Sequence, residues 1–324
     1  MTARITKRAL FRAAGAAAAL AVLPQGIAAA GRLSVVATTG MIADTARRIG
    51  GDVVDVRALM APGVDPHAYR QTRSDIVAMV RADQVLAHGL YLEAQMENFL
   101  EDLGRRRNVA RVGEAVPEDL LLGHESYADK FDPHVWMDPV RWSLVAMRIR
   151  DVLSAARPDD AALFAGNTDS FLGELTVLRD YSETVLATVP ETRRVLLTAH
   201  DAFRYFGAAY GFEVLGIQGI STESEAGLNR IGVLVDTIVA RDIGAVFVES
   251  SVSDRNIRAL IEGAAARGQK TTIGGELFSD AMGPEGTYEG TYLGMIDHNV
   301  TTIAAALGGS VPPRGMSGRL SAGI

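Results

Sequence analysis

Residues 159–188 read DDAALFAGNTDSFLGELTVLRDYSETVLAT, and this stretch decides how the chain is organised. It contains no proline and two glycines, and large apolar residues recur in it at roughly helical spacing: Leu163, Phe171, Leu175, Leu178 and Leu186. The pattern predicts one helix of about 28 residues, which would be about 42 Å long at 1.5 Å per residue. We expect this linking helix, residues 159–189, to join two lobes, with Pro190 just past its end.

Short β-rich or apolar runs alternate with helical patterns on both sides of this helix. The predicted strands are 33–38, 53–59, 84–87 and 109–112 before it, and 194–198, 213–217, 245–248 and 271–273 after it. Strands that alternate with helices indicate parallel sheets covered by helices. We therefore predict an α/β fold of two lobes, residues 31–158 and 190–308, each a mostly parallel sheet flanked by helices. A Gly-, Ser- and Pro-rich flexible tail would follow at 309–324.

The first thirty residues have the layout of a cleaved secretory signal peptide. Four basic residues and no acidic one begin the chain, an apolar run follows at 13–23, and Ala28 and Ala30 form a small-residue cleavage site. The apolar run is too short to span a bilayer. Residues 6–12 also resemble a twin-arginine signal with Lys7 in the first arginine position, so both Sec and Tat export stay open. We expect the mature chain in the periplasm.

The composition limits the partners of the chain. Of its 324 residues, 48% are apolar and 22% charged, which is ample material for a core without disulfides. Loss of residues 1–30 would change the net charge from −7 to about −11, which disfavours nucleic acid and anionic membranes and suits a cation. Because the sequence has no cysteine, we expect no lipid anchor on an N-terminal cysteine and no thiolate metal ligand. We also expect a monomer.

Three of the six histidines and one aspartate lie in loops that follow predicted strands. His67 and His134 belong to the first lobe, and each follows an Asp-Pro pair, whereas His200 and Asp280 belong to the second lobe. The carboxyl ends of strands in open parallel sheets meet in one crevice, where ligands bind. Three imidazoles and one carboxylate there would bind Zn²⁺, and also Mn²⁺ if the carboxylate uses both oxygens. A single histidine of this kind more often has a structural role, so the pattern alone leaves the site open.

Five segments around these residues carry a family resemblance: DPH at 65–67, HGLYLE at 88–93, FDPHVW at 131–136, TAHDAF at 198–203 and GGELFSDAMG at 274–283. Together they resemble the metal-binding, TroA- and ZnuA-like cluster (cluster A-I) of periplasmic solute-binding proteins that serve ABC importers. The similarity runs from about residue 33 to about residue 307. It implies one divalent metal ion as cargo, Mn²⁺ or Zn²⁺, held by His67, His134, His200 and Asp280. It also implies an ABC permease with its ATPase as partner, and no catalysis.

The cargo metal and two other functions stay open. Zinc-specific members of the family often carry a long His- and acid-rich loop before the second ligand, but residues 120–130 have only His124, Glu125 and Asp129 of these types. Some manganese members have Glu in place of His200, so both metals stay plausible cargo, with Zn²⁺ expected to bind more tightly in vitro. A zinc-dependent metalloenzyme would need an open coordination position and a general base. A metal chaperone or adhesin on the same fold is the other alternative.

Several neighbours of the expected ligands are candidates for supporting roles. A metal-bound histidine usually donates its other ring N–H to an acceptor, and Asp65, Asp138 and Asp201 could each accept it. Turn or helix-cap roles are equally open for these three aspartates. Trp136 and Tyr69 are expected to wall the site.

The remaining histidines, His88, His124 and His298, are expected outside the ligand set. Residues 221–225 form an acidic segment near the predicted mouth of the crevice. This segment is expected to be a solvated loop, and docking of a permease is the alternative.

Overall fold

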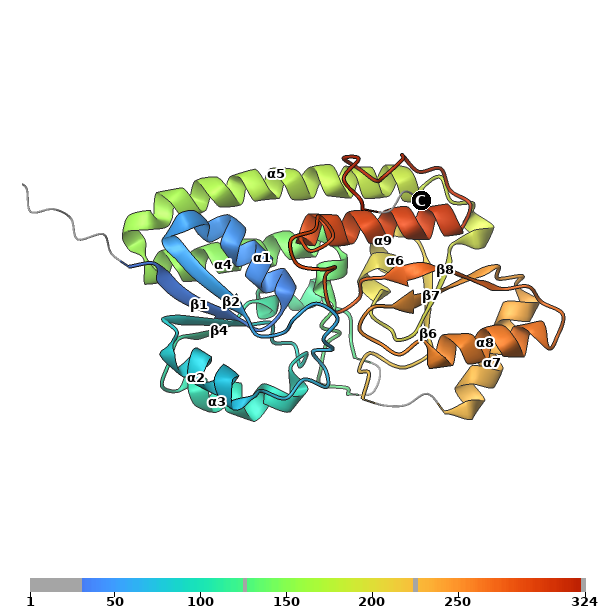
Figure 1. Ribbon diagram of the computed structural model, residues 1–324, viewed down its shortest axis with the longest axis horizontal. Coiled ribbons are helices and arrows are strands. Elements are labelled where there is room, and N and C mark those ends of the chain that lie inside the picture. Colours follow the sequence, from blue (N-terminus) through green and yellow to red (C-terminus); the bar gives the residue numbers. More distant parts are fainter. Residues whose placement is uncertain (1–30, 125–126, 224–226, 322–324) are drawn as a thin grey trace, which may run out of the picture. The chain divides into compact units, whose positions relative to one another are not determined.

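The computed structural model describes residues 31–124, 127–223 and 227–321. The predicted signal peptide, residues 1–30, lies outside these described residues. From Arg32 onward the chain forms one compact unit (Figure 1). Within the described part of the chain, no helix is both long enough and apolar enough to cross a bilayer.

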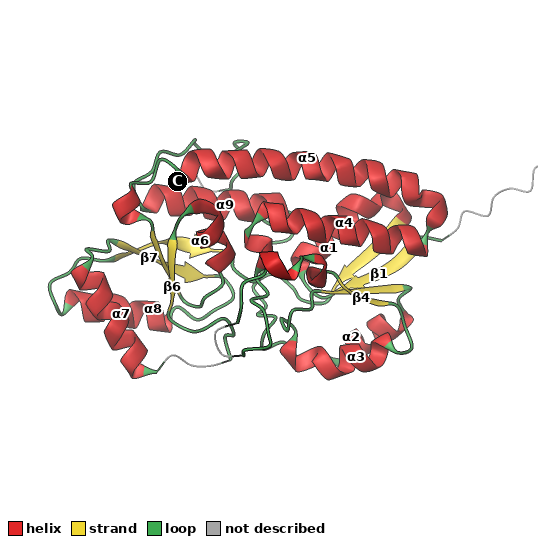
Figure 2. Cartoon of the chain, turned by 180° about the vertical axis from the view of Figure 1, so that it is seen from behind, coloured by secondary structure: helices red, strands yellow, loops and turns green. Residues whose placement is uncertain are grey.

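The first half contains a four-stranded parallel sheet in the order β2-β1-β3-β4. Its strands β1 and β3 are short apolar runs that are almost fully buried, because helices cover both faces of the sheet. Helices α1 and α4 lie on one face and α2 and α3 on the other (Figures 1 and 2). The bounds of these elements are β1 (Leu33–Ala37), α1 (Gly40–Gly50), β2 (Val54–Ala58), α2 (Arg73–Arg81), β3 (Gln84–Ala87), α3 (Glu97–Gly104), β4 (Val109–Arg111) and α4 (Pro139–Ala156).

The second half contains two parallel strand pairs, β5 with β6 and β7 with β8, and β5 packs beside β7. Helices α7 and α8 lie on one side of the strands, and α6 and α9 lie on the other (Figure 2). The bounds are β5 (Val195–Thr198), α6 (Arg204–Tyr210), β6 (Glu213–Gly216), α7 (Leu228–Ala240), β7 (Ala245–Glu249), α8 (Arg255–Ala265), β8 (Thr272–Leu277) and α9 (Tyr292–Ala306). The predicted α/β class with parallel strands flanked by helices is therefore confirmed. The second sheet is divided into two pairs.

The predicted linking helix is α5 (Ala161–Leu186), whose 26 residues make it about 39 Å long. It packs against α1 and α4 of the first half and against α9 of the second (Figure 1). Its buried Thr168 and Ser182 hydroxyls donate to backbone carbonyls one turn earlier, each at 2.7 Å, so they enter the core without leaving a polar atom unpaired. The main hydrophobic core runs through both halves, and the lobe boundaries 31–158, 159–189 and 190–308 stay a prediction.

Residues 309–321, where we expect a flexible tail, contact α9, and the tail stays a prediction. The buried Asp297 carboxylate of α9 accepts the backbone N–H of Met316 at 2.9 and 3.0 Å, and Leu320 is buried. Gly315 has φ +77°, and a Cβ at this position would lie 2.5 Å from a carboxylate oxygen of Asp297. A carboxylate with no exposed surface needs donors, and the glycine lets the chain approach closely enough to supply them.

Candidate metal centre

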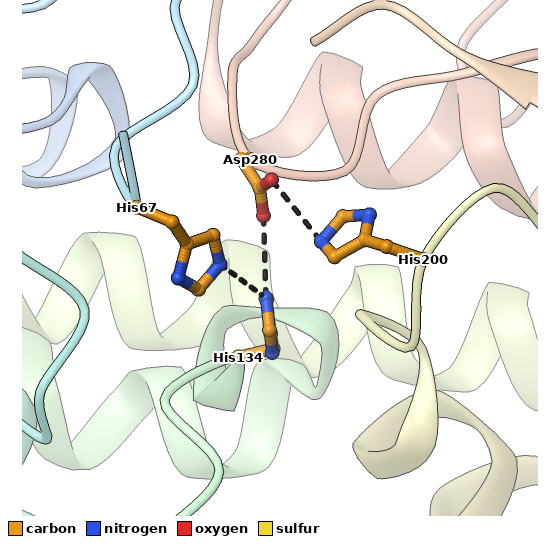
Figure 3. Close-up of side chains that lie close together, drawn as sticks. All are labelled: His67, His134, His200 and Asp280. Carbon is orange, nitrogen blue, oxygen red and sulfur yellow. Dashed lines mark hydrogen bonds and ion pairs between the residues drawn. The ribbon is translucent and has the colours of Figure 1, made fainter. Parts of the chain in front are cut away.

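The four residues expected to bind metal converge on one buried point (Figure 3). One potential ligand atom from each of His67, His134, His200 and Asp280 lies within 4.8 Å of the others. His67 is in the loop after β2, His134 lies between β4 and α4, His200 lies two residues past the end of β5, and Asp280 lies three residues past the end of β8. His134 and His200 are fully buried, and the other two residues are each 2% exposed.

The ring nitrogens of the histidines face one another and the carboxylate. The Nε2 atoms of His67 and His134 are 3.2 Å apart. Nε2 of His134 lies 3.3 Å from Oδ1 of Asp280, and Nε2 of His200 lies 3.2 Å from Oδ2 of the same carboxylate (Figure 3). Both carboxylate oxygens therefore face the imidazoles, so the set offers three nitrogens and two oxygens to a single ion.

Two buried carboxylates fix the orientation of two of the rings. Oδ1 of Asp132 accepts from Nδ1 of His134 at 2.7 Å and from its backbone N–H at 3.0 Å. Glu249 accepts from Nδ1 of His200 at 2.5 Å and from its backbone N–H at 2.8 Å. A carboxylate at Nδ1 holds a proton there, so Nε2 is the nitrogen of each ring that faces the position of a metal.

From the sequence, we expect other carboxylates, those of Asp65, Asp138 and Asp201, to orient the histidines. Asp138 instead caps α4 by accepting from the backbone N–H of Val140, and Asp201 pairs with Arg204 at 3.7 Å. The signal for Asp132 was present, since it precedes its histidine by two residues just as Asp65 precedes His67. Glu249 has no local signal, because only the packing of β7 beside β5 brings it to His200.

Asp65 acts on the main chain of His67. It accepts the backbone N–H of His67 at 2.8 Å and the hydroxyl of Thr222 at 2.5 Å. Thr222 belongs to the loop after β6, so a residue of the second half touches the loop of the first half that carries His67. Gln95 and Glu223 make a second contact of this kind, at 2.7 and 2.8 Å. The segment expected to be a solvated acidic loop thus contacts the first half at 222–223, and residues 224–226 lie outside the described residues.

The pKa values show how the site balances its charges without an ion. Burial lowers the pKa of His67 to about 3, so this ring is neutral. Burial opposes a charge on His134 as well, but Asp132 and Asp280 raise its pKa to about 9. On His200, Asp280 and Glu249 likewise outweigh burial and hold the pKa well above its usual value. Burial opposes ionisation of Asp280, but His200 and His134 keep its pKa well below the usual range. Protons on two rings therefore supply positive charge that a bound cation would replace.

The other residues singled out from the sequence lie outside the ligand set. His88 is buried, with Nε2 at 2.7 Å from the carbonyl oxygen of Pro133, and His298 contacts the carbonyl of Glu276 at 2.8 Å. His124 packs against Tyr127 at the protein surface. Tyr69 donates its hydroxyl to Asp75 at 2.7 Å instead of to any ligand.

The arrangement defines a class of α/β protein that encloses one small ligand between two halves. The chain belongs to the ZnuA family, described as zinc-uptake complex component A, periplasmic, whose family model matches residues 35–306.

Proteins of the same kind are similar over almost the whole described chain. The manganese-binding lipoprotein MntA of Bacillus subtilis (strain 168) is 47% identical over 276 residues, which is 85% of this chain and 90% of MntA. The zinc-binding protein TroA of Treponema pallidum (strain Nichols) is 44% identical over 280 residues, or 86% of this chain and 90% of TroA. The solved structure of the periplasmic zinc-binding TroA from Treponema pallidum superposes with a TM-score of 0.83 at 43% identity, and 86% of this chain and 99% of that chain are covered.

Proposed function

We propose that this chain is an extracytoplasmic solute-binding protein that captures one divalent transition-metal ion, Mn²⁺ or Zn²⁺, and delivers it to an ABC importer. The ion is cargo, and His67, His134, His200 and Asp280 are its ligands. The partner is the permease of the importer together with its ATPase. We propose that the protein is exported to the periplasm by the segment 1–30 and works there as a monomer.

The observation that carries this proposal is the buried set of three imidazoles and one carboxylate, supplied in equal parts by the two halves. Imidazole and carboxylate ligands suit Zn²⁺, and a carboxylate that presents both oxygens also suits Mn²⁺. The printed names of MntA and TroA, manganese-binding and zinc-binding, support the same two metals. A catalytic zinc needs an open coordination position for water or substrate. Four protein ligands whose atoms lie within 4.8 Å of one another leave little room for such a position, which favours transport over hydrolysis.

Titration of the purified, metal-free chain with Zn²⁺ and with Mn²⁺ tests the proposal. We expect one tightly held ion per chain, because the described residues contain one convergent ligand group. Calorimetry and elemental analysis of protein taken from its native compartment both give the ratio. Two comparably tight ions per chain, or none, would contradict the proposal. Rapid hydrolysis of ester or peptide substrates by the metal-loaded protein would replace it with a metalloenzyme.

The affinity for the ion should rise with pH between about 5 and 9. A protonated imidazole has no lone pair for a metal, and the raised pKa of His134, about 9, means that its ring carries a proton at pH 7 in the ion-free protein. Each proton that the ion displaces makes the affinity fall about tenfold for each pH unit below the pKa. Titrations at pH 6, 7 and 8, in two buffers of different ionisation enthalpy, measure both the slope and the protons released. An affinity that stays constant over this range would be incompatible with a three-histidine site.

A further inference from the structure

Trp136 links the loops that carry two of the four ligands. Trp136 lies two residues after His134, in the short turn Val135–Met137, and its side chain is fully buried. Its indole N–H donates to the carbonyl oxygen of Ser279 at 2.7 Å. Ser279 precedes Asp280 in the chain, so this one bond joins the neighbourhoods of a ligand from the first half and a ligand from the second.

The main chain of Trp136 is held by the second half as well. The hydroxyl of Tyr292, at the start of α9, donates to the carbonyl oxygen of Trp136 at 2.8 Å. The indole ring packs edge-on against the imidazole of His134, with 5.1 Å between ring centroids, and against that of His88 at the same distance. His88 in turn contacts the carbonyl oxygen of Pro133, the residue before His134. Contacts with both loops therefore fix Trp136: its ring packs against His134, its N–H bonds Ser279, and its carbonyl accepts from Tyr292.

The carboxylate of Asp280 has few other supports outside the ligand set. Its Oδ2 lies 3.4 Å from the hydroxyl of Ser251, which is a long hydrogen bond. Its position relative to His134 thus depends on where the main chain at Ser279 and Asp280 is held. A hydrogen bond in a water-free interior is rigid, since breaking it leaves a buried carbonyl without a partner.

We propose that Trp136 is a positioning residue for the ion: its indole N–H bond to Ser279 sets the separation between His134 and Asp280 across the two halves. This inference rests on the proposed metal-binding function and adds to it a residue that never touches the ion. The indole ring also shields His134 from water, but the positioning role belongs to the N–H group.

The chain supplies a control, because its other tryptophan is also buried but its indole N–H bond does not reach a loop that carries one of the four proposed ligands. Trp142 is also fully buried and its indole N–H donates to the hydroxyl of Thr45 at 3.1 Å, within the first half. Trp136→Phe and Trp142→Phe each remove one buried indole donor. Only the first removes a bond next to Asp280.

The test compares the two variants with the parent chain, using Zn²⁺ for affinity and Co²⁺ as a spectroscopic probe of coordination. We expect Trp136→Phe to weaken Zn²⁺ binding by ~10–100-fold, the range found when groups behind metal ligands are removed. The visible spectrum of its Co²⁺ complex should change in intensity, because Asp280 no longer meets the ion in the same geometry. Trp142→Phe should lower the melting temperature of the ion-free protein about as much as Trp136→Phe does. It should nevertheless leave the Zn²⁺ affinity within ~3-fold of that of the parent chain and the Co²⁺ spectrum unchanged.

Unchanged affinity and an unchanged Co²⁺ spectrum in Trp136→Phe would overturn the inference, and so would equal effects in both variants. If Trp136→Phe does not fold, Tyr292→Phe decides, since it removes the other bond between Trp136 and the second half. We expect it to shift the affinity in the same direction by a smaller factor, and no effect on affinity or spectrum would count against the role of Trp136. Should the parent chain itself bind neither metal, the proposed function fails before the inference is tested.

Discussion

The His67→Ala variant should bind Zn²⁺ at least ~10–100-fold more weakly than the parent chain, taking the loss caused by groups behind metal ligands as a lower bound. His67 is the clearest of the four ligands to test, because burial lowers its pKa to about 3 and the ring is uncharged in the ion-free protein. Its removal therefore takes away a ligand without leaving a buried charge uncompensated. Competition with a chelator of known affinity, followed by titration, measures the loss.

Equivalent changes at His134, His200 and Asp280 should weaken binding in the same direction. Asp280→Ala should also destabilise the ion-free protein, because two buried rings with raised pKa lose their counter-charge. His298→Ala is the control, since its ring contacts the carbonyl of Glu276 and the ring of Phe278 and lies outside the proposed ligand set. A parent-like affinity in His67→Ala, together with a large loss in His298→Ala, would show that the ligands are assigned wrongly.

Saturation with Zn²⁺ should raise the free energy of unfolding by about 4 kcal/mol when the free ion is at 1,000 times its dissociation constant. The reason is mass action: the ligand atoms come from loops on both halves and meet only in the folded chain, so the ion stabilises the folded state over the unfolded one. For a chain of this size the melting temperature should increase by roughly 7 °C. Thermal unfolding followed by circular dichroism, with and without the ion, measures this increase.

The same measurement on His200→Ala should give a much smaller increase, because the weaker affinity lowers the ratio of free ion to dissociation constant. His298→Ala should respond like the parent chain, and an excess of chelator should return the parent chain to its ion-free melting temperature. A variant lacking His200 that is still stabilised by the full amount would remove this residue from the ligand set.

Local sequence patterns were enough to predict the helices and strands, and to predict that the metal-binding side chains follow the carboxyl ends of strands. The apolar spacing in 159–188 predicts a linking helix at 159–189, and α5 begins two residues later and ends three residues earlier, because a helix packed on one side must repeat its buried residues every three or four positions. The ligands could be proposed because each follows a strand and because the surrounding segments resemble a family. Neither argument needs to know which strands are neighbours.

Contacts across long stretches of sequence could not be predicted in this way. Glu249 reaches His200 from 49 residues further along the chain, and Trp136 reaches Ser279 from 143 residues before it. The packing of β5 beside β7 brings Glu249 to His200, and the contact between the two halves brings Trp136 to Ser279. The spacing of apolar residues along the sequence predicts neither contact. The contact between the tail at 309–321 and the buried Asp297 could not be predicted for a related reason, since composition says nothing about which carboxylate accepts its N–H groups.

The four proposed ligands are spread from position 67 to position 280, so the site does not exist until most of the chain has folded. The route of export therefore decides in which compartment the ion is first acquired. A chain that crosses the membrane unfolded carries no assembled site and can take an ion only from the periplasm, in competition with whatever metals are abundant there. A chain that crosses already folded is loaded inside the cell, where the cytoplasm controls which metal is available. The metal that the four side chains bind would therefore depend on the metal supply of the periplasm in the first case and of the cytoplasm in the second.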